Sequence, residues 1–251
     1  MSASHTAPGR LLLVPAPLVD VEQAALTDVL PRATLEAAAS LDHWIVENAR
    51  TTRAVLGAVN REIPLRVALQ QQILTVLPKH DELDARAARA LLQPALAGID
   101  MGLMSEAGAP CVADPGARIV AAAHELGIPV VPLVGPSSIL LALMASGLDG
   151  QRFAFHGYLP VEPQGRAQRL RELERDSARH RQTQLFIETP YRNAALLKAL
   201  LETLHPDTRV SIACELTSPL ASIRTLSVAQ WRTRQDALPR KAPAMFGFLA
   251  A

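Results

Sequence analysis

The stretch that decides the fold runs from Met104 to Pro160 and reads MSEAGAPCVADPGARIVAAAHELGIPVVPLVGPSSILLALMASGLDGQRFAFHGYLP. Three apolar runs in or just before this stretch end abruptly in glycine, proline or serine. The runs and the loops that follow them are 99–104 with 105–110, 128–134 with 135–138, and 153–156 with 157–160. Each run has the length of a buried strand, and helix-like sequence follows the first two. In open α/β sheets, ligands bind beyond the carboxyl ends of strands, where small residues leave the backbone accessible. Three such loops in one segment favour a ligand site over ordinary tight turns.

The alternation of strands and helices begins well before this stretch. We expect strands at 11–14, 43–47, 73–77, 99–104 and 130–133, and helices at 22–30, 50–59, 84–92, 118–126 and 137–146, with a further helical turn from Thr34. Gly127 stands just past a helix, where glycine favours left-handed backbone geometry. Such an alternation predicts a mostly parallel sheet with helices on both faces.

A second domain follows the polar, glycine-containing stretch 147–151, which is the best candidate for a linker. We expect the domains to span residues 1–148 and 149–251. The second domain has predicted strands at 153–156, 184–188, 209–213, 222–228 and 244–249, and helices at 164–177 and 192–204. Little helix separates the strands at 209–213 and 222–228, which indicates antiparallel pairing. The predicted fold class is therefore α/β, with two α/β domains and a mixed sheet in the second.

Composition excludes several classes of protein. Hydrophobic residues make up 49% of the 251 residues and charged residues 20%, as in globular proteins. The first ten residues lack the apolar run of a leader, and no stretch is long enough to span a bilayer, so we expect no membrane segment. The net charge of +1 argues against nucleic-acid binding over the whole surface and leaves room for a local basic face.

Cysteine usage and the absence of common motifs narrow the chemistry further. The two cysteines, Cys111 and Cys214, cannot form a disulfide framework and have no histidines at zinc spacing, so we expect a cytoplasmic protein without a metal. The chain has no Walker loop, no Gly-x-Gly-x-x-Gly after a strand and no Gly-x-Ser-x-Gly. The sequence motifs that usually indicate an ATPase, an NAD enzyme or a serine hydrolase are therefore missing.

A series of motifs resembles one known family. SEAGAPCVADPG is similar to the S-D-A-G-x-P-x-x-S-D-P-G signature of the tetrapyrrole-methylase superfamily, in the branch of the 16S ribosomal-RNA cytidine 2′-O-methyltransferases. PLVGPSSIL with SGL, FAFHGYLP, FIETPYR and ACELT resemble the later blocks of that branch, in the same order. Upstream, LLLVPAPLVD and VENARTTRAVL resemble its first-strand loop and its E-D-T-R helix start. The resemblance covers the chain from about Leu11 onward, and the ordered series is far more specific than any single block.

The resemblance implies a methyltransferase that uses S-adenosylmethionine (SAM), with SAM in the cleft between two α/β domains and with a homodimer as the usual assembly. It assigns to the cofactor residues from both domains: Pro15, Ser105, Glu106, Ala107, Gly108, Pro110, Val134, Gly135, Ser137, Ser138, Tyr158, Leu159, Glu188 and Ala213.

The chain departs from the family pattern at four places. Leu18-Val19-Asp20 replaces a glycine and an asparagine of the first loop, and Asn48 replaces the aspartate of E-D-T-R. Glu106 replaces the first aspartate of the signature, whereas Asp114 keeps the second. Lys241-Ala242-Pro243 replaces a C-terminal Lys-Gly-Glu. We therefore expect a side branch that retains SAM binding, with the methyl acceptor left open.

Methyl transfer from a sulfonium needs positioning more than a catalytic dyad, because the methyl donor is already activated. Ser105, Ala107 and Gly108 would bring the main chain close to SAM. Ser137 and Ser138 stand at a helix N-terminus, where they either cap the helix or bind the methionine carboxylate. Tyr158 would cover the adenine or the methionine chain, or else pack between the domains.

An oxygen nucleophile also needs a base or an orienting group near its proton. The candidates for that role are Glu47, Glu106, Asp114 and Glu188, all at predicted strand ends or loops. For each of them, capping or pairing with an arginine such as Arg50 or Arg192 is the alternative. His156 is a weaker candidate, and His124 is expected on the surface of a helix.

The predicted helix that starts at 164 is rich in arginine, as are the residues that follow it up to 181. This segment contains Arg166, Arg169, Arg171, Arg175, Arg179 and Arg181, with Leu170 and Leu173 to pack inward. A solvated amphipathic helix is the first interpretation, and contact with RNA phosphates is the second.

Three functions remain open from the sequence. The first is a SAM-dependent methyltransferase that acts on RNA, by resemblance through 2′-O-methylation of ribosomal RNA. The second has a small-molecule, tetrapyrrole-like acceptor, and the third is a non-catalytic module that binds SAM.

Overall fold

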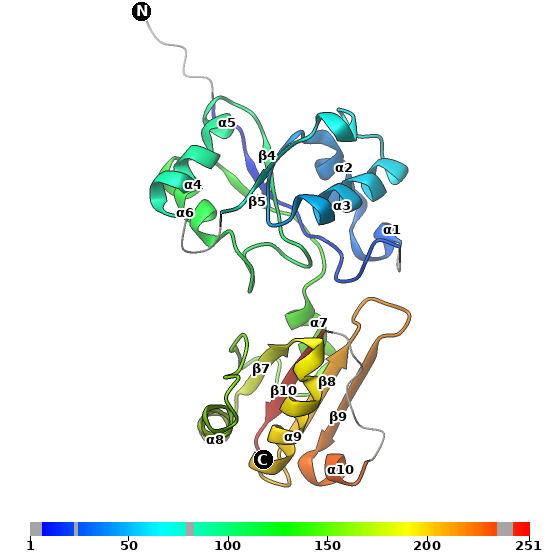
Figure 1. Ribbon diagram of the computed structural model, residues 1–251, viewed down its shortest axis with the longest axis vertical. Helices are drawn as coiled ribbons and strands as arrows, with labels where there is room; N and C mark the ends of the chain where they lie inside the picture. Colours follow the sequence, from blue (N-terminus) through cyan, green and yellow to red (C-terminus); the bar gives the residue numbers. More distant parts are fainter. Residues whose placement is uncertain (1–6, 23–24, 79–82, 235–242) are drawn as a thin grey trace, which may run out of the picture. The chain divides into compact units, whose positions relative to one another are not determined.

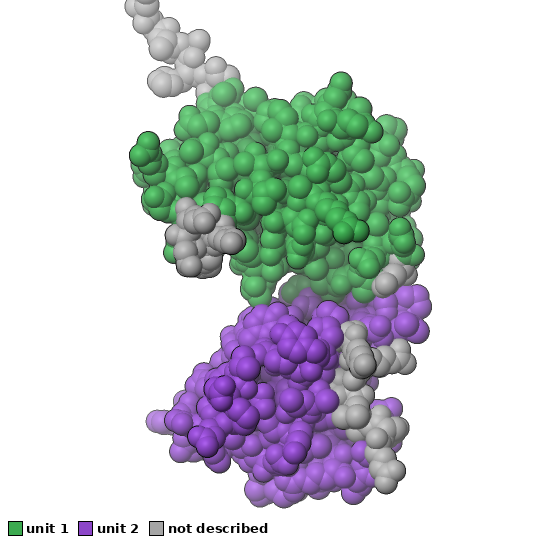
Figure 2. All heavy atoms as spheres, in the orientation of Figure 1, with its two compact units in different colours: residues 1–137 green, residues 138–251 purple. Residues whose placement is uncertain are grey.

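The computed structural model describes residues 7–22, 25–78, 83–234 and 243–251. It divides the chain into a first unit that ends at Ser137 and a second that begins at Ser138 (Figures 1 and 2). The sequence placed the boundary later, after residue 148. The difference concerns α7 (Ser138–Ser146), which packs against three strands of the second sheet and so belongs to the unit that follows it.

Five parallel strands, all within the described residues, form the sheet of the first unit. They are β1 (Leu11–Leu13), β2 (His43–Val46), β3 (Ile73–Val76), β4 (Met101–Met104) and β5 (Val130–Pro132), in the order β3-β2-β4-β1-β5. Every neighbouring pair is parallel. The carboxyl ends of the strands therefore share one edge of the sheet, as the sequence predicted.

Helices cover both faces of this sheet. They are α1 (Leu26–Val29), α2 (Arg32–Ser40), α3 (Ala49–Glu62), α4 (Ala85–Leu91), α5 (Gln93–Leu96) and α6 (Ala117–Glu125), with a 3₁₀ turn η1 (Leu69–Gln71). Along β1, Leu12 packs in the cluster formed with α1, α2 and α3, and Leu11 in the cluster formed with α4, α5 and α6. Successive strand residues point to opposite faces, so buried apolar residues are needed on both.

Two helices of this unit differ from the prediction. Among the described residues of the helix expected at 22–30, Leu26–Val29 are helical and Glu22 lies in a turn. The short α5 was not predicted. It starts a new helix beside α4 with Pro94 in its first turn, where proline is tolerated.

Gly127, just past α6, has a φ of 69°, which confirms the left-handed position expected there.

The second unit is built on a mixed sheet. Its strands are β6 (Phe153–Phe155), β7 (Thr183–Glu188), β8 (Arg209–Cys214), β9 (Ser222–Ser227) and β10 (Ala244–Leu249), in the order β6-β7-β10-β8-β9. Only β6 and β7 are parallel, and the other neighbours are antiparallel. The predicted antiparallel pairing of β8 with β9 is confirmed, and with it the α/β fold class with a mixed second sheet.

The core of the second unit lies between this sheet and three helices, α8 (Pro163–His180), α9 (Asn193–Thr203) and α10 (Val228–Arg232). Phe186, Phe246 and Phe248 are fully buried there, and Leu170 and Leu173 of α8 pack on them from the helix side. A 3₁₀ turn η3 (Pro190–Arg192) links β7 to α9.

Within the part of the chain that the structure describes, no helix is long and apolar enough to cross a membrane.

Gly102 of β4 lies opposite Trp44 of β2 in the first sheet, and Trp44 donates a buried hydrogen bond of 2.8 Å to Gln72 Oε1. A Cβ atom at position 102 would lie 2.3 Å from the Trp44 ring. We predict that Gly102→Ala lowers the free energy of unfolding by about 3 kcal/mol, because the ring has no room to move in a close-packed core. Urea unfolding measures this. Gly150→Ala is the control, because nothing lies within 4 Å of a Cβ there; an equal effect of both changes would contradict the packing explanation.

Candidate functional site

Two loops meet just beyond the ends of β1 and β4. Ala16 N–H donates to Gly108 C=O at 2.9 Å, and Gly108 N–H donates back to Ala16 C=O at 3.0 Å. This pair fixes the loop after β1 to the loop after β4. Gly108 has a φ of 73°, a left-handed conformation that glycine adopts without strain.

The loop after β5 joins the same group. A Cβ atom on Gly135 would lie 2.4 Å from Pro15 Cβ, so the two residues are in direct contact. A Cβ atom on Gly108 would lie 3.2 Å from Leu18 Cδ2 and 3.7 Å from the carbonyl oxygen of Pro136. The structure therefore brings together Pro15, Gly108 and Gly135, three of the residues that the sequence assigned to a cofactor.

The other assigned residues of this unit lie in the same loops. Ser105 and Pro110 are buried, Ala107 is exposed, and Ser137 is partly exposed. Val134 exposes 71% of its surface, and its carbonyl accepts a hydrogen bond of 2.7 Å from Thr34 Oγ1. Because the side chains of these loops are small, main-chain groups are their main recognition elements.

Three candidate carboxylates gather at the same edge of the sheet. Glu47 follows β2, and its Oε2 accepts a hydrogen bond of 2.9 Å from the backbone N–H of Glu106. Burial raises the pKa of Asp114 to about 6, and the neighbouring charges of Glu47 and Glu106 add to that rise. Burial, with Asp114 beside it, also raises the pKa of the Cys111 thiol to about 11, so this cysteine is not a thiolate near neutral pH.

Asn48 is the residue of this cluster that the list of site candidates missed. Its Nδ2 donates to Glu106 Oε1 at 2.5 Å, and its Oδ1 accepts from the backbone N–H groups of Arg50 and Thr51, which caps α3. The sequence had shown Asn48 and Glu106 as separate departures from the family pattern. The structure shows that the two side chains form a hydrogen bond with each other, so the glutamate at 106 and the amide at 48 occur together.

Strained backbone surrounds Asp114. Cys111 has a φ of 67° and Ala113 a φ of 64°, and neither is glycine. A left-handed non-glycine residue costs roughly 1–2 kcal/mol, and such strain concentrates at functional sites. Residue types alone gave no signal of this strain, since neither cysteine nor alanine is typical of that region.

The second unit holds a separate group of candidates. Glu188 exposes 1% of its surface and forms an ion pair of 2.6 Å with Arg192, so the pairing considered as its alternative role is confirmed. The Arg192 guanidinium lies 5.9 Å from the centre of the Tyr158 ring, which is 56% exposed. Leu159 and Ala213 are buried, and Ser138 is the first residue of α7.

Two further left-handed residues lie in the ACELT block after β8. Glu215 has a φ of 51° and Thr217 a φ of 70°. A β-branched residue in this region is a clear outlier, so the loop is held in place by its surroundings.

Of the C-terminal departure Lys241-Ala242-Pro243, the first two residues lie outside the described part of the chain. Among the described residues, no three of His, Cys, Asp or Glu are placed to hold a metal ion.

The family of Tetrapyrrole (Corrin/Porphyrin) Methylases matches residues 26–230 of this chain. The chain belongs to the tetrapyrrole methylase family. The predicted superfamily and the predicted methyltransferase activity are thereby confirmed.

Several relatives carry the name ribosomal RNA small subunit methyltransferase I. The protein of Vibrio cholerae is 32% identical over 229 residues, which are 90% of this chain and 72% of that protein. The protein of Mesorhizobium japonicum is 36% identical over 200 residues, 80% of this chain and 63% of that protein. The protein of Escherichia coli O157:H7 is 30% identical over 222 residues, 88% of this chain and 70% of that protein.

Two solved structures of methyltransferases share the fold. The methyltransferase CobJ superposes with a TM-score of 0.60 at 17% identity, over 97% of this chain and 95% of that one. Uroporphyrin-III-C-methyltransferase from Thermus thermophilus gives 0.51 at 20% identity, over 96% and 94%. At these identities the likeness supports the architecture alone.

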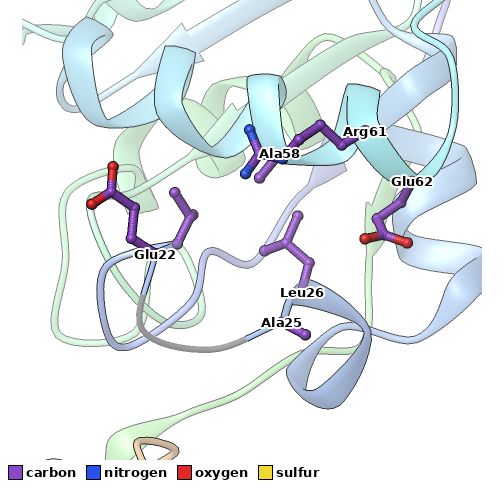
Figure 3. A pocket seen from close by; sticks show the side chains of 7 residues that line it. Glu22, Ala25, Leu26, Ala58, Arg61 and Glu62 are labelled. Atoms are coloured by element: carbon purple, nitrogen blue, oxygen red, sulfur yellow. The ribbon is translucent and has the colours of Figure 1, made fainter.

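A cavity of about 360 Å³ in the first unit lies apart from the candidate residues. Figure 3 shows Glu22, Ala25 and Leu26 on one side and Ala58, Arg61 and Glu62 of α3 on the other. A second cavity, of about 520 Å³, lies near the amino ends of β2 and β4. Its arginines already have partners: Arg10 pairs with Asp100 at 2.6 Å, and Arg66 pairs with Asp42. We interpret these two ion pairs as stabilising the fold.

The raised pKa of Asp114 predicts a pH-dependent stability. The folded state binds the proton more tightly than the unfolded state, so Asp114 favours folding least above pH 6, where it must ionise among other carboxylates. Asp114→Asn should therefore stabilise the protein by about 1 kcal/mol near pH 8, after allowance for solvent screening, and progressively less toward pH 4. Urea unfolding at several pH values measures the difference between variant and parent. Asp176→Asn, at an exposed site on α8, is the control; a pH-independent difference for Asp114→Asn would contradict the prediction.

The contact between Asn48 and Glu106 predicts coupled mutations. Asn48→Asp keeps the cap of α3 but sets a second carboxylate against Glu106 Oε1, so near pH 8 it should destabilise the protein by roughly 1–3 kcal/mol. Adding Glu106→Gln restores a hydrogen bond with donor and acceptor exchanged, and should recover most of the loss. A double-mutant cycle by urea unfolding tests this. Additive effects of the two changes would show that the contact contributes nothing.

Proposed function

We propose that this protein transfers a methyl group from SAM to a ribose hydroxyl of small-subunit ribosomal RNA. The observation that carries the proposal is the meeting of the loops after β1, β4 and β5 beside the carboxylate cluster of Glu47, Glu106 and Asp114. The names of the relatives, which match 80–90% of this chain, support RNA as the acceptor.

The first-unit loops fit a cofactor with many polar groups. Ser105, Ala107 and Gly108 present main chain with little side chain, and the left-handed Gly108 turns the backbone where a side chain would be strained. SAM, when bound there, supplies a methyl group already activated on a sulfonium. The part of Tyr158, Leu159, Glu188 and Ala213 in cofactor binding stays a prediction.

The carboxylates provide a place for the proton of the acceptor hydroxyl. As the oxygen forms its new bond to carbon, its proton must leave, and a carboxylate within hydrogen-bond reach can accept or orient it. Asp114, with a pKa of about 6, is tuned closer to neutrality than an ordinary aspartate and is the best candidate for the base. Glu106, fixed through both its backbone and its side chain, is the best candidate for the orienting group.

We also propose that the protein acts in the cytoplasm, where ribosomal subunits are assembled, and that it forms a homodimer, as the family resemblance implies. Exposed apolar residues on α7 support an assembly: Leu140 exposes 53% of its surface and Met144 79%. Sedimentation analysis tests the dimer.

We predict that the purified protein binds SAM in the micromolar range and methylates small ribosomal subunits from a strain that lacks this protein. Gly108→Val should abolish both, because the branched side chain is strained at this φ and occupies space beside Leu18 and Pro136. Gly127→Val is the matched control: Gly127 has a similar φ of 69°, but a Cβ there meets nothing within 4 Å. Titration calorimetry measures binding, and nucleoside analysis locates the methyl group.

The outcomes separate the three candidate functions. SAM binding with a new 2′-O-methylated nucleoside supports the proposal. SAM binding with methylation of a small macrocycle, and none of RNA, would favour the tetrapyrrole-like acceptor. Binding without turnover on any acceptor would favour the non-catalytic module, and the absence of SAM binding would overturn all three.

A further inference from the structure

The arginines of α8 lie in different surroundings, although the sequence placed them together. Arg166 exposes only 8% of its surface, its Nη1 donates to the carbonyl of Val161 at 3.4 Å, and its Nε has no partner among the described residues. It lies on the buried side of α8 with Leu170, Leu173 and Ser177. Arg169 is paired with Glu172 at 3.2 Å. Arg166 is therefore not part of an exposed basic surface, and the charge of Arg169 is partly offset by Glu172.

A different set of arginines faces outward. Arg171, Arg175 and Arg179 are all exposed and recur every four residues. Residues at this spacing lie on one face of a helix, on successive turns, and rise by about 6 Å from one to the next. We call these three residues the arginine stripe. It lies on α8, which Figure 1 shows almost end-on.

The acidic residues of α8 leave the stripe largely uncompensated. Glu172 accepts hydrogen bonds from Gln168 and Arg169, which lower its pKa more than Arg175 does. Glu174 accepts from the backbone N–H of His205 and from Thr208 Oγ1. Asp176 is exposed one position past Arg175, about 100° further round the helix. Within the described residues, no ion pair is formed by any member of the stripe.

We propose that the arginine stripe binds the phosphate backbone of the RNA substrate. The inference rests on the proposed function and names the surface that RNA uses. Phosphates along an RNA strand form a regular row of negative charge, and exposed arginine or lysine side chains neutralise such phosphates. Among its described residues, α8 exposes no large apolar side chain, whereas protein–protein interfaces depend on such anchors. The stripe thus fits a polyanion better than a protein.

The test compares three variants that carry three substitutions each. Arg171→Gln/Arg175→Gln/Arg179→Gln removes the charge of the stripe, and the corresponding lysine variant keeps it. Arg53→Gln/Arg61→Gln/Arg86→Gln removes the same charge from exposed arginines of the first unit. Binding to protein-free 16S RNA and to intact small subunits is measured over a range of salt concentrations, alongside methyl transfer, SAM affinity and thermal unfolding.

We expect the glutamine stripe variant to bind protein-free RNA roughly ten- to hundredfold more weakly at physiological salt. Its slope of log K against log salt should be smaller by about two, because three phosphate contacts are lost. The lysine variant and the first-unit control should stay within a few-fold of the parent. SAM affinity and thermal unfolding should be unchanged in all three, because every substituted side chain is exposed.

Each other outcome overturns the proposal in a distinguishable way. If the stripe variant loses no more RNA affinity than the control, the stripe is only a solvated face. If it weakens binding to intact subunits but not to protein-free RNA, the stripe contacts a ribosomal protein. If the parent itself neither binds nor methylates RNA, the proposed function fails and the stripe's role fails with it.

Discussion

Ala16 and Gly108 exchange two backbone hydrogen bonds just beyond β1 and β4, and the architecture of the candidate site depends on this pair. Neither strand continues into the loops as regular sheet, and the pair is an isolated antiparallel bridge that joins the loops after two parallel strands. Gly108 can take part because its positive φ turns the chain back toward the strand edge. Gly135 then fits against Pro15 because it has no Cβ atom. Small residues at three distant positions are thus required by packing within the first unit, before any ligand is considered.

The same edge gathers negative charge, which a fold does not tolerate without compensation. The pairing of β2 with β4 aligns Val46 with Met104, so the residues that follow, Glu47 and Glu106, are brought together by the sheet itself. Two features reduce the resulting repulsion. Asn48 supplies an amide where the family pattern has a carboxylate, and Asp114 holds its proton up to a higher pH than usual. A cluster kept at this cost in stability is typical of a site that handles protons.

The sequence predicted most of the fold because its strands are short apolar runs that end in proline, glycine or polar residues. It predicted less well where the deciding contact is remote. Arg166 stands among arginines and reads as a surface residue, but its position beside Leu170 and Leu173 buries it. The apolar α7 lies before a polar, glycine-containing stretch, yet packing against the second sheet decides its unit. Asn48 and Glu106 are 58 residues apart, and no local pattern indicates that they are in contact.

The α8 helix shows how one segment can meet two demands without conflict. Its packing against the second sheet depends on Leu170, Leu173 and Ser177, all fully buried, and Ser177 Oγ both donates to the carbonyl of Gln182 and accepts from the backbone N–H of Ala250. The face that carries Arg171, Arg175 and Arg179 contributes nothing to that packing, because these residues are exposed. Charge on the outer face can therefore change without loss of the fold, since exposed helical positions affect stability only slightly. The three arginines have no ion-pair partner among the described residues and do little for the helix that carries them, which is why we propose that they bind RNA.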